Sequence, residues 1–182
     1  MKYGVILWGF LALPSMRYYL ELNLTTHMLV QIPLLVTSGW LVGRKLTSSY
    51  FEKINRNGIP GLLVGLFTLL FWMIPRWLDA SLTNPFWEAV KFITIPGLVG
   101  VPLGASWFLL KPIARGFVWA NGISMLLILG WLYLEAPMRV CNNYLVNQQE
   151  YFAYNTFGIA IAIAVYWVSV AFYGDWKNAG KR

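Results

Sequence analysis

Long apolar runs alternate with short polar connectors along the whole chain. A helix that crosses a bilayer needs about 20 mostly apolar residues, and six of the runs approach that length. We predict helices at residues 3–22, 27–43, 59–75, 92–110, 116–135 and 153–173. The pattern therefore predicts an all-α fold, a polytopic transmembrane helical bundle of about six helices, with residues 1–182 forming a single integral membrane domain.

The first run is the most interrupted of the six. Lys2 precedes its apolar core and Pro14 and Arg17 follow it, which superficially resembles a secretory signal peptide. No small-residue cleavage site follows cleanly, however, and Tyr18 and Tyr19 continue an aromatic pattern typical of the membrane interface. We interpret this run as a retained helix whose outer end lies in the interface.

Composition agrees with the membrane class. Of the 182 residues, 58% are hydrophobic and 12% are charged, whereas a soluble domain carries roughly 25% charged residues. The chain has one cysteine, which excludes an internal disulfide framework and any metal centre built from several cysteines of this chain.

The net charge of +7 indicates membrane topology rather than a nucleic-acid partner, because the basic residues are scattered between the apolar runs. With six alternating helices, one side receives four basic residues, Arg17, Arg76, Lys91 and Arg139. The other side receives ten: Lys2, Arg44, Lys45, Lys53, Arg56, Lys111, Arg115, Lys177, Lys181 and Arg182. The positive-inside rule then places both termini in the cytoplasm and the protein in the cell's inner (cytoplasmic) membrane.

Small residues spaced four apart predict close helix packing. Such pairs let two backbones approach within a membrane. They occur in the third, fourth and sixth runs as Gly61 and Gly65, Gly100 and Gly104, and Gly158 and Ala162. The fourth run also holds Pro96 and Pro102, which predict a kinked packing helix.

Two outer connectors are distinctive. Residues 75–91 alternate charges with Trp77 and Trp87, which suit the headgroup region. Residues 135–155 are rich in amides that offer hydrogen bonds without charge. As candidate interface residues toward other membrane subunits we single out Trp77, Trp87, Asn142, Asn143, Gln148 and Gln149.

The soft metal ligands gather on the predicted outer side. Thioether, thiolate and imidazole groups together favour Cu(I), and the candidate ligands are His27, Met28, Met73, Met138 and Cys141. Gln31 lies one helical turn after His27 and could orient its imidazole. The alternative is that the methionines fill apolar gaps and that His27 is a hydrogen-bonding residue at the membrane interface.

Catalytic patterns are missing from the sequence. A single histidine allows no histidine-based triad within the chain, and no HExxH, P-loop or dinucleotide fingerprint occurs. We therefore expect no enzymatic activity. Because no charged residue falls within the core of a confidently assigned span, we also rank a small transporter third among the candidate functions.

Three stretches resemble the CtaG-like membrane proteins, which assist copper insertion into haem-copper oxidases. They are HMLVQIPLL from His27, residues 71–92, and residues 142–167. The chain lacks most of that family's histidines, since Ile32 follows Gln31, residues 89–91 hold none, and Asn147 stands where an acidic residue is expected. The resemblance implies a shortened, divergent relative whose role is protein contact.

Two functions follow from these observations. The first is a non-catalytic accessory subunit of a larger membrane metalloenzyme, either a terminal oxidase or a copper-dependent monooxygenase. The alternative is a copper-handling assembly factor for such an enzyme, with copper as its possible cofactor. The lipid bilayer and other membrane subunits are the expected partners.

Overall fold

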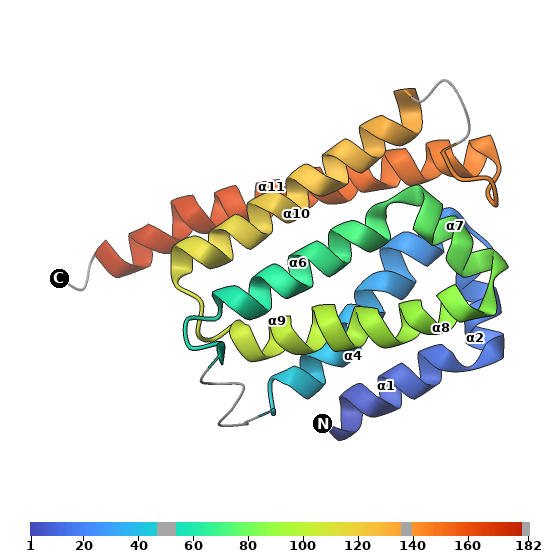
Figure 1. Cartoon of the computed structure of the whole chain (residues 1–182). Coiled ribbons are helices and arrows are strands. Elements are labelled where there is room, and N and C mark those ends of the chain that lie inside the picture. The colour runs from blue at the N-terminus through green and yellow to red at the C-terminus, as the bar shows by residue number, and fades with distance from the viewer. Residues whose placement is uncertain (47–53, 136–139, 180–182) are drawn as a thin grey trace.

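The computed structural model describes residues 1–46, 54–135 and 140–179, and within them every regular element is a helix (Figure 1). The elements are α1 (Lys2–Ala12), α2 (Pro14–Glu21), α3 (Leu24–Thr26), the π-helical η1 (His27–Gln31), α4 (Ile32–Gly43), α6 (Ile59–Met73), α7 (Pro75–Thr83), α8 (Pro85–Thr94), the π-helical η2 (Ile95–Gly100), α9 (Val101–Ser106), α10 (Pro112–Glu135) and α11 (Val146–Ala179). The predicted all-α class is thus confirmed for the described part of the chain. Met138 lies outside it.

Four helical stretches are long and apolar enough to cross a membrane, which supports a multi-pass membrane protein. They are Leu24–Gly43, Pro85–Ser106, Pro112–Glu135 and Val146–Val170. A fifth arises if α6 and α7, which meet at an angle of 72°, count as one broken span.

The first predicted helix, 3–22, is divided in the structure. Leu13 is extended, with φ −62° and ψ 133°, and Pro14 begins α2. Proline has no N–H to continue a helix but fits the first helical position. The N-terminal part of the predicted helix, α1, is consequently an apolar helix of only 11 residues. Trp8 nevertheless anchors α1 to the bundle by donating from Nε1 to the Phe92 carbonyl oxygen, 2.8 Å away.

The fourth predicted helix begins earlier than the sequence indicated. Asn84 accepts a hydrogen bond from the Phe86 amide at 2.9 Å and Pro85 occupies the first helical position, so α8 starts at residue 85 instead of 92. Residues 85–106 then form a continuous span through Pro96 and Pro102. Lys91, predicted to lie in a connector, is therefore within a helix that could cross the membrane.

Each π-helical segment ends two residues before a proline. Ile32 donates to the carbonyl of His27 and precedes Pro33, while Val101 donates to the carbonyl of Pro96 and precedes Pro102. A π-turn widens the helix by one residue. This widening accommodates the prolines without breaking either span.

Glycines allow a close helix contact where α4 crosses η2 and α9. A Cβ added to Gly39 would collide with the Pro96 carbonyl oxygen, and one added to Gly104 would collide with that of Trp40. Gly43 and Gly100 are equally confined by backbone atoms. The packing expected of Gly100 and Gly104 is confirmed, whereas a Cβ on Gly158 would meet no described atom within 4 Å.

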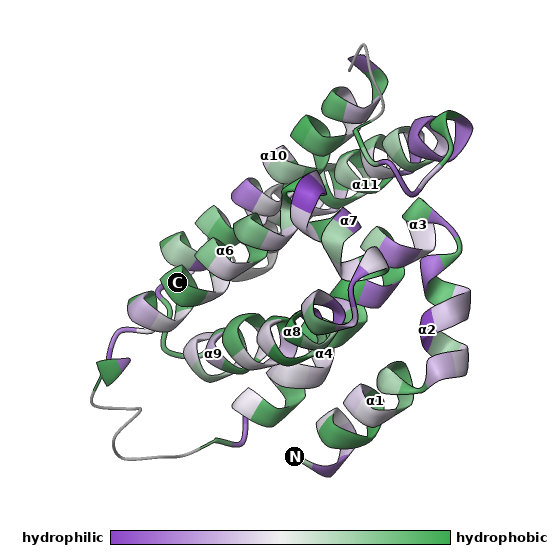
Figure 2. Ribbon diagram, turned by 45° about the vertical axis from the view of Figure 1, so that its right-hand side comes forward, coloured by the Kyte–Doolittle hydropathy of each residue, from purple (hydrophilic) through white to green (hydrophobic). Residues whose placement is uncertain are grey.

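The helices run roughly side by side, and their connectors gather at two ends (Figure 1). One end, called the α7 end, holds α2, α3, α7 and residues 140–145. The opposite end holds the start of α1, the end of α4 and the turn between α9 and α10. Polar residues concentrate in α2 and around α3 and α7, while the helices between the ends are mostly apolar (Figure 2).

Candidate functional site

A buried polar network lies at the α7 end of the bundle. Lys91 of α8 and His27 of η1 are each 0% exposed. Lys91 Nζ lies 2.8 Å from Glu21 Oε1 and 3.1 Å from His27 Nε2, and His27 Nδ1 lies 2.8 Å from the Tyr144 hydroxyl. The network thus joins α2, η1, α8 and the connector before α11.

The hydrogen bonds define the protonation of the network. The Tyr144 hydroxyl donates to the carbonyl oxygen of Glu21 at 3.0 Å, so its single proton is used there. Burial raises the pKa of Tyr144, which keeps that proton in place. His27 must then donate from Nδ1 to Tyr144 and accept from the Lys91 ammonium at Nε2. The imidazole is neutral, and both of its nitrogens are occupied within the chain.

Gln31 has a different partner from the one expected. Its Nε2 donates to Glu21 Oε1 at 3.0 Å, and its Oε1 is buried without a partner in the described structure. Lys91 and Tyr144, rather than Gln31, orient the imidazole of His27. Gln31 instead helps to hold the Glu21 carboxylate beside Lys91.

Sequence reasoning missed Lys91, Glu21 and Tyr144 as members of the site. We expected no charged residue within the core of a confidently assigned span, but the buried Lys91 lies inside the span Pro85–Ser106. The argument against a transporter from the lack of buried charge therefore no longer holds. One signal was available: Lys91, Ile95 and Val99 lie four residues apart and form one buried face of the helix. A charge on such a face indicates a buried partner.

Replacing Tyr144 with phenylalanine is expected to lower the free energy of unfolding by about 1–3 kcal/mol, because the buried Nδ1–H of His27 loses its acceptor. Unfolding in mixed detergent micelles would measure the difference. Tyr154→Phe is the control, since Tyr154 is 65% exposed. Equal effects of the two variants would contradict the proposed hydrogen bond.

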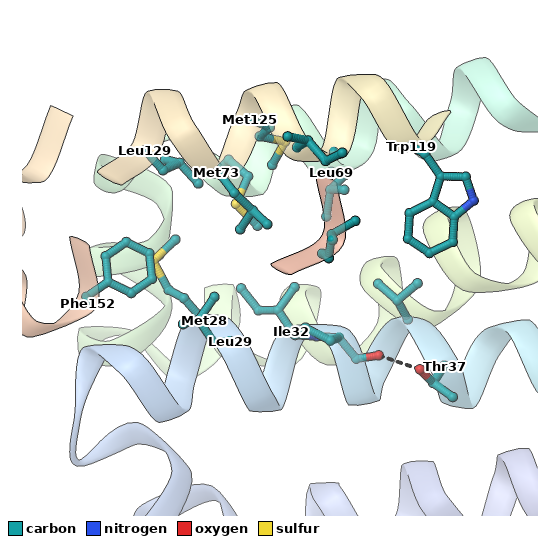
Figure 3. A pocket seen from close by; sticks show the side chains of 16 residues that line it. Met28, Leu29, Ile32, Thr37, Leu69, Met73, Trp119, Met125, Leu129 and Phe152 are labelled. Carbon is teal, nitrogen blue, oxygen red and sulfur yellow. Dashed lines mark hydrogen bonds between the residues drawn. The ribbon is translucent and has the colours of Figure 1, made fainter. Parts of the chain in front are cut away.

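The candidate sulfur ligands are only partly brought together. The Tyr133 hydroxyl lies 3.0 Å from Cys141 Sγ and 4.0 Å from Met28 Sδ, so these two sulfurs share one neighbour. Met28 and Met73 line the same cavity together with Met125 (Figure 3). Among the residues described, no group of three His, Cys, Asp or Glu side chains could hold a metal ion.

Burial also affects the chemistry of Cys141. The side chain is 0% exposed, and burial raises the pKa of its thiol to about 12. The thiol is therefore protonated near neutral pH, and a metal ion would have to displace the proton in order to bind sulfur.

We expect Cys141 in the folded protein to react with a maleimide at pH 8 about a hundredfold or more slowly than an exposed thiol, because the thiolate is the nucleophile. The comparison is the Cys141→Ser, Asn143→Cys variant, whose new thiol replaces an exposed side chain two residues away. Labelling would be followed by mass spectrometry, with unfolded protein as the reference. Equal rates in the two folded proteins would contradict the buried, protonated thiol.

The amide-rich connector is folded onto the bundle. The backbone N–H of Asn142 donates to Asp79 Oδ2 at 2.8 Å, and the side-chain Nδ2 of Asn143 donates to Asp79 Oδ1 at 3.1 Å. Gln149 is buried and donates to the carbonyl oxygens of Cys141 and Tyr144. The Gln149 side chain therefore serves the connector itself, while Asn142 and Asn143 are exposed.

The remaining candidate interface residues lie at the same end. Gln148 donates to Asn23 Oδ1 at 3.0 Å. The rings of Trp77 and Trp87 are 4.6 Å apart between centroids and partly buried, so they pack α7 against α8. Their contact stabilises the turn between these two helices.

No protein-family model, curated protein or solved structure matches this chain.

Proposed function

We propose that the protein is a non-catalytic accessory subunit of a larger membrane complex, bound through the α10–α11 hairpin. The observation that carries the proposal is the small fraction of this hairpin that is buried. In the most apolar window of each span, 44% of the positions are buried for Leu24–Gly43 and Pro85–Ser106, but 17% for Pro112–Glu135 and Val146–Val170. Of these four spans, the two helices of the hairpin have the smallest share of buried positions.

The outward face of α11 supports contact with another helix. Asn155, Gly158, Ala162 and Ser169 recur at helical spacing, and the first three are exposed. The same small-residue spacing brings α4 against η2 and α9 within this chain, but Gly158 has no such partner among the described residues. In a membrane, small residues favour helix association through close backbone approach.

The polar network supports a structural role for the buried titratable groups. Each of Lys91, His27 and Tyr144 forms a hydrogen bond with another member of the network. None of these three residues lines any of the described cavities. We therefore assign the network to stability and not to catalysis.

The finer topology and the host complex belong to the same proposal. We place α1 and α2 together as the least regular of six membrane segments, with the opposite end of the bundle and both termini in the cytoplasm, in the inner membrane. Lys2, Arg44, Lys45, Lys111 and Arg115 at that end support this orientation. The resemblance to CtaG-like proteins favours a terminal oxidase or a copper-dependent monooxygenase as host.

Extraction in a mild detergent tests the proposal. The wild-type protein should be recovered in a larger complex, and Gly158→Leu should shift it toward the free form without lowering its stability. Gly97→Leu is the matched control, because Gly97 lies outside the hairpin, is exposed, and a Cβ there also meets no described atom within 4 Å. Recovery of the wild-type chain solely as a free monomer would refute the subunit function.

A copper-handling assembly factor is the second candidate, favoured by the shared neighbours of Met28, Met73 and Cys141. Copper at His27 would have to displace Lys91 or Tyr144 from the ring. If this candidate function is correct, the purified protein should bind Cu(I) in competition with a chelator. A His27→Ala, Cys141→Ser variant should lose this Cu(I) binding. Unchanged affinity in that variant would remove this site.

A further inference from the structure

A cavity of about 460 Å³ lies between the α10–α11 hairpin and the rest of the bundle. η1 and α4 supply Met28 and Ile32 on one side, α6 supplies Met73, α10 supplies Met125, and α11 closes the Met28 end with Phe152 (Figure 3). All of these helices except α6 belong to spans that could cross a membrane unbroken. The cavity therefore lies among helices that are long and apolar enough to be embedded in a bilayer.

The lining offers almost nothing to a polar ligand. Among the side chains that line the cavity, only Thr37 and Trp119 carry a polar group, and the Thr37 hydroxyl already donates to the Pro33 carbonyl at 2.7 Å. A water molecule needs two to four polar partners to occupy a cavity. The interior therefore suits a hydrocarbon, and flexible thioethers adapt to its shape.

The cavity is long and parallel to the helices. Along η1 and α4 it extends from Met28 to Thr37, which at 1.5 Å per residue is about 14 Å. Along α10 it extends from Trp119 to Leu129, about 15 Å. Helices that cross a membrane and lipid tails run in the same general direction, so this axis matches an extended chain.

A second cavity of about 140 Å³ continues the first along α10. The two share Leu69, Gly122 and Met125 in their linings. A Cβ added at Gly122 would meet no described atom within 4 Å. The absence of a side chain at residue 122 therefore leaves the space open where the two cavities meet.

We propose that an acyl chain of a membrane phospholipid binds in this cavity and joins the α10–α11 hairpin to the rest of the bundle. An empty cavity forfeits the dispersion contacts of its lining, and the bilayer supplies linear hydrocarbon at high concentration. Thr37 and Trp119 lie at the same end of the cavity (Figure 3). The ester end of the chain lies there, and its methyl end lies at Met28 and Phe152.

Photolabelling in phosphatidylcholine vesicles tests the site. The full-length protein is reconstituted with a phospholipid that carries a diazirine near the methyl end of one acyl chain, illuminated and mapped by mass spectrometry. The label is expected on the segments that contain Met28 and Phe152. With the diazirine near the ester, the label is expected near Thr37 and Trp119 instead.

A variant that fills the cavity provides a second test of the lipid site. Gly122→Leu is expected to lower labelling of the Met28 segment about tenfold, because a close-packed interior leaves no room for the chain, while Gly116→Leu, outside both linings, leaves it unchanged. If the wild-type protein were labelled only on outward-facing residues such as Ile128 and Trp131, the proposal would be overturned. Displacement by an isoprenoid quinone but not by excess unlabelled phospholipid would overturn the assignment to phospholipid.

Discussion

Replacing Glu21 with glutamine is expected to destabilise the folded protein by about 3–5 kcal/mol, because the fully buried Lys91 ammonium then has no compensating charge. Glutamine keeps an oxygen that can accept from Lys91 Nζ, so the variant removes the charge and little else. Lys91 has no route to water, being 0% exposed. The whole cost of its unpaired charge therefore falls on the folded state.

The reciprocal variant is expected to cost less. Lys91→Met leaves Glu21 unpaired, but the Glu21 side chain is 15% exposed and can recover part of its hydration. The expected loss is about 1–3 kcal/mol. The double variant should lose less than the sum of the two single losses, since it removes both charges together.

Unfolding by SDS in mixed micelles would measure all three differences in free energy. Glu150→Gln is the control, because Glu150 is exposed on α11. The buried ion pair would be contradicted if Glu21→Gln and Glu150→Gln had the same effect. Strict additivity in the double variant would show that the two charges do not interact.

Adding a single methyl group at Gly39 is expected to lower the free energy of unfolding by at least about 2 kcal/mol, the upper part of the range for overpacked cores. The new Cβ would collide with the backbone of Pro96, which cannot move aside as a side-chain end could. α4 would have to separate from η2, and the contacts around this crossing would loosen together.

Gly97→Ala is the matched control in the neighbouring segment. A Cβ at Gly97 meets no described atom within 4 Å, and alanine gains about 0.5–1 kcal/mol over glycine inside a helix. The control should therefore be neutral or slightly stabilising in the same SDS titration. If Gly39→Ala behaved like Gly97→Ala, the close crossing of α4 and η2 would be wrong.

Much of the fold could be predicted from the sequence because apolar runs are a local signal. The runs at 27–43, 116–135 and 153–173 each lie within an observed helix. The first residues of helices were harder to predict. Asn84 caps α8 and Pro85 begins it within a stretch of charged and aromatic residues that is typical of a connector. Pro14 showed an interruption of the first run but not that α1 would be so short.

The site could be predicted only in part, because its contacts join distant parts of the chain. His27 and Gln31 share a helical face, and their polarity marked that turn as unusual. Nothing local indicated that Lys91, 64 residues after His27, would meet its imidazole, or that Tyr144, 117 residues after it, would hold the other nitrogen. Such pairings depend on how the helices pack.

The same separation sets the order in which the network can form during synthesis. Glu21 and Lys91 can pair once residue 91 has been made, but Tyr144 follows Lys91 by 53 residues. At 5–20 residues per second this is a delay of roughly 3–11 seconds. During that interval the Nδ1–H of His27 lacks its final acceptor, so the N-terminal helices remain incomplete. Arrival of the 140–145 connector is therefore the step at which the hydrogen bonds of the buried network can be completed.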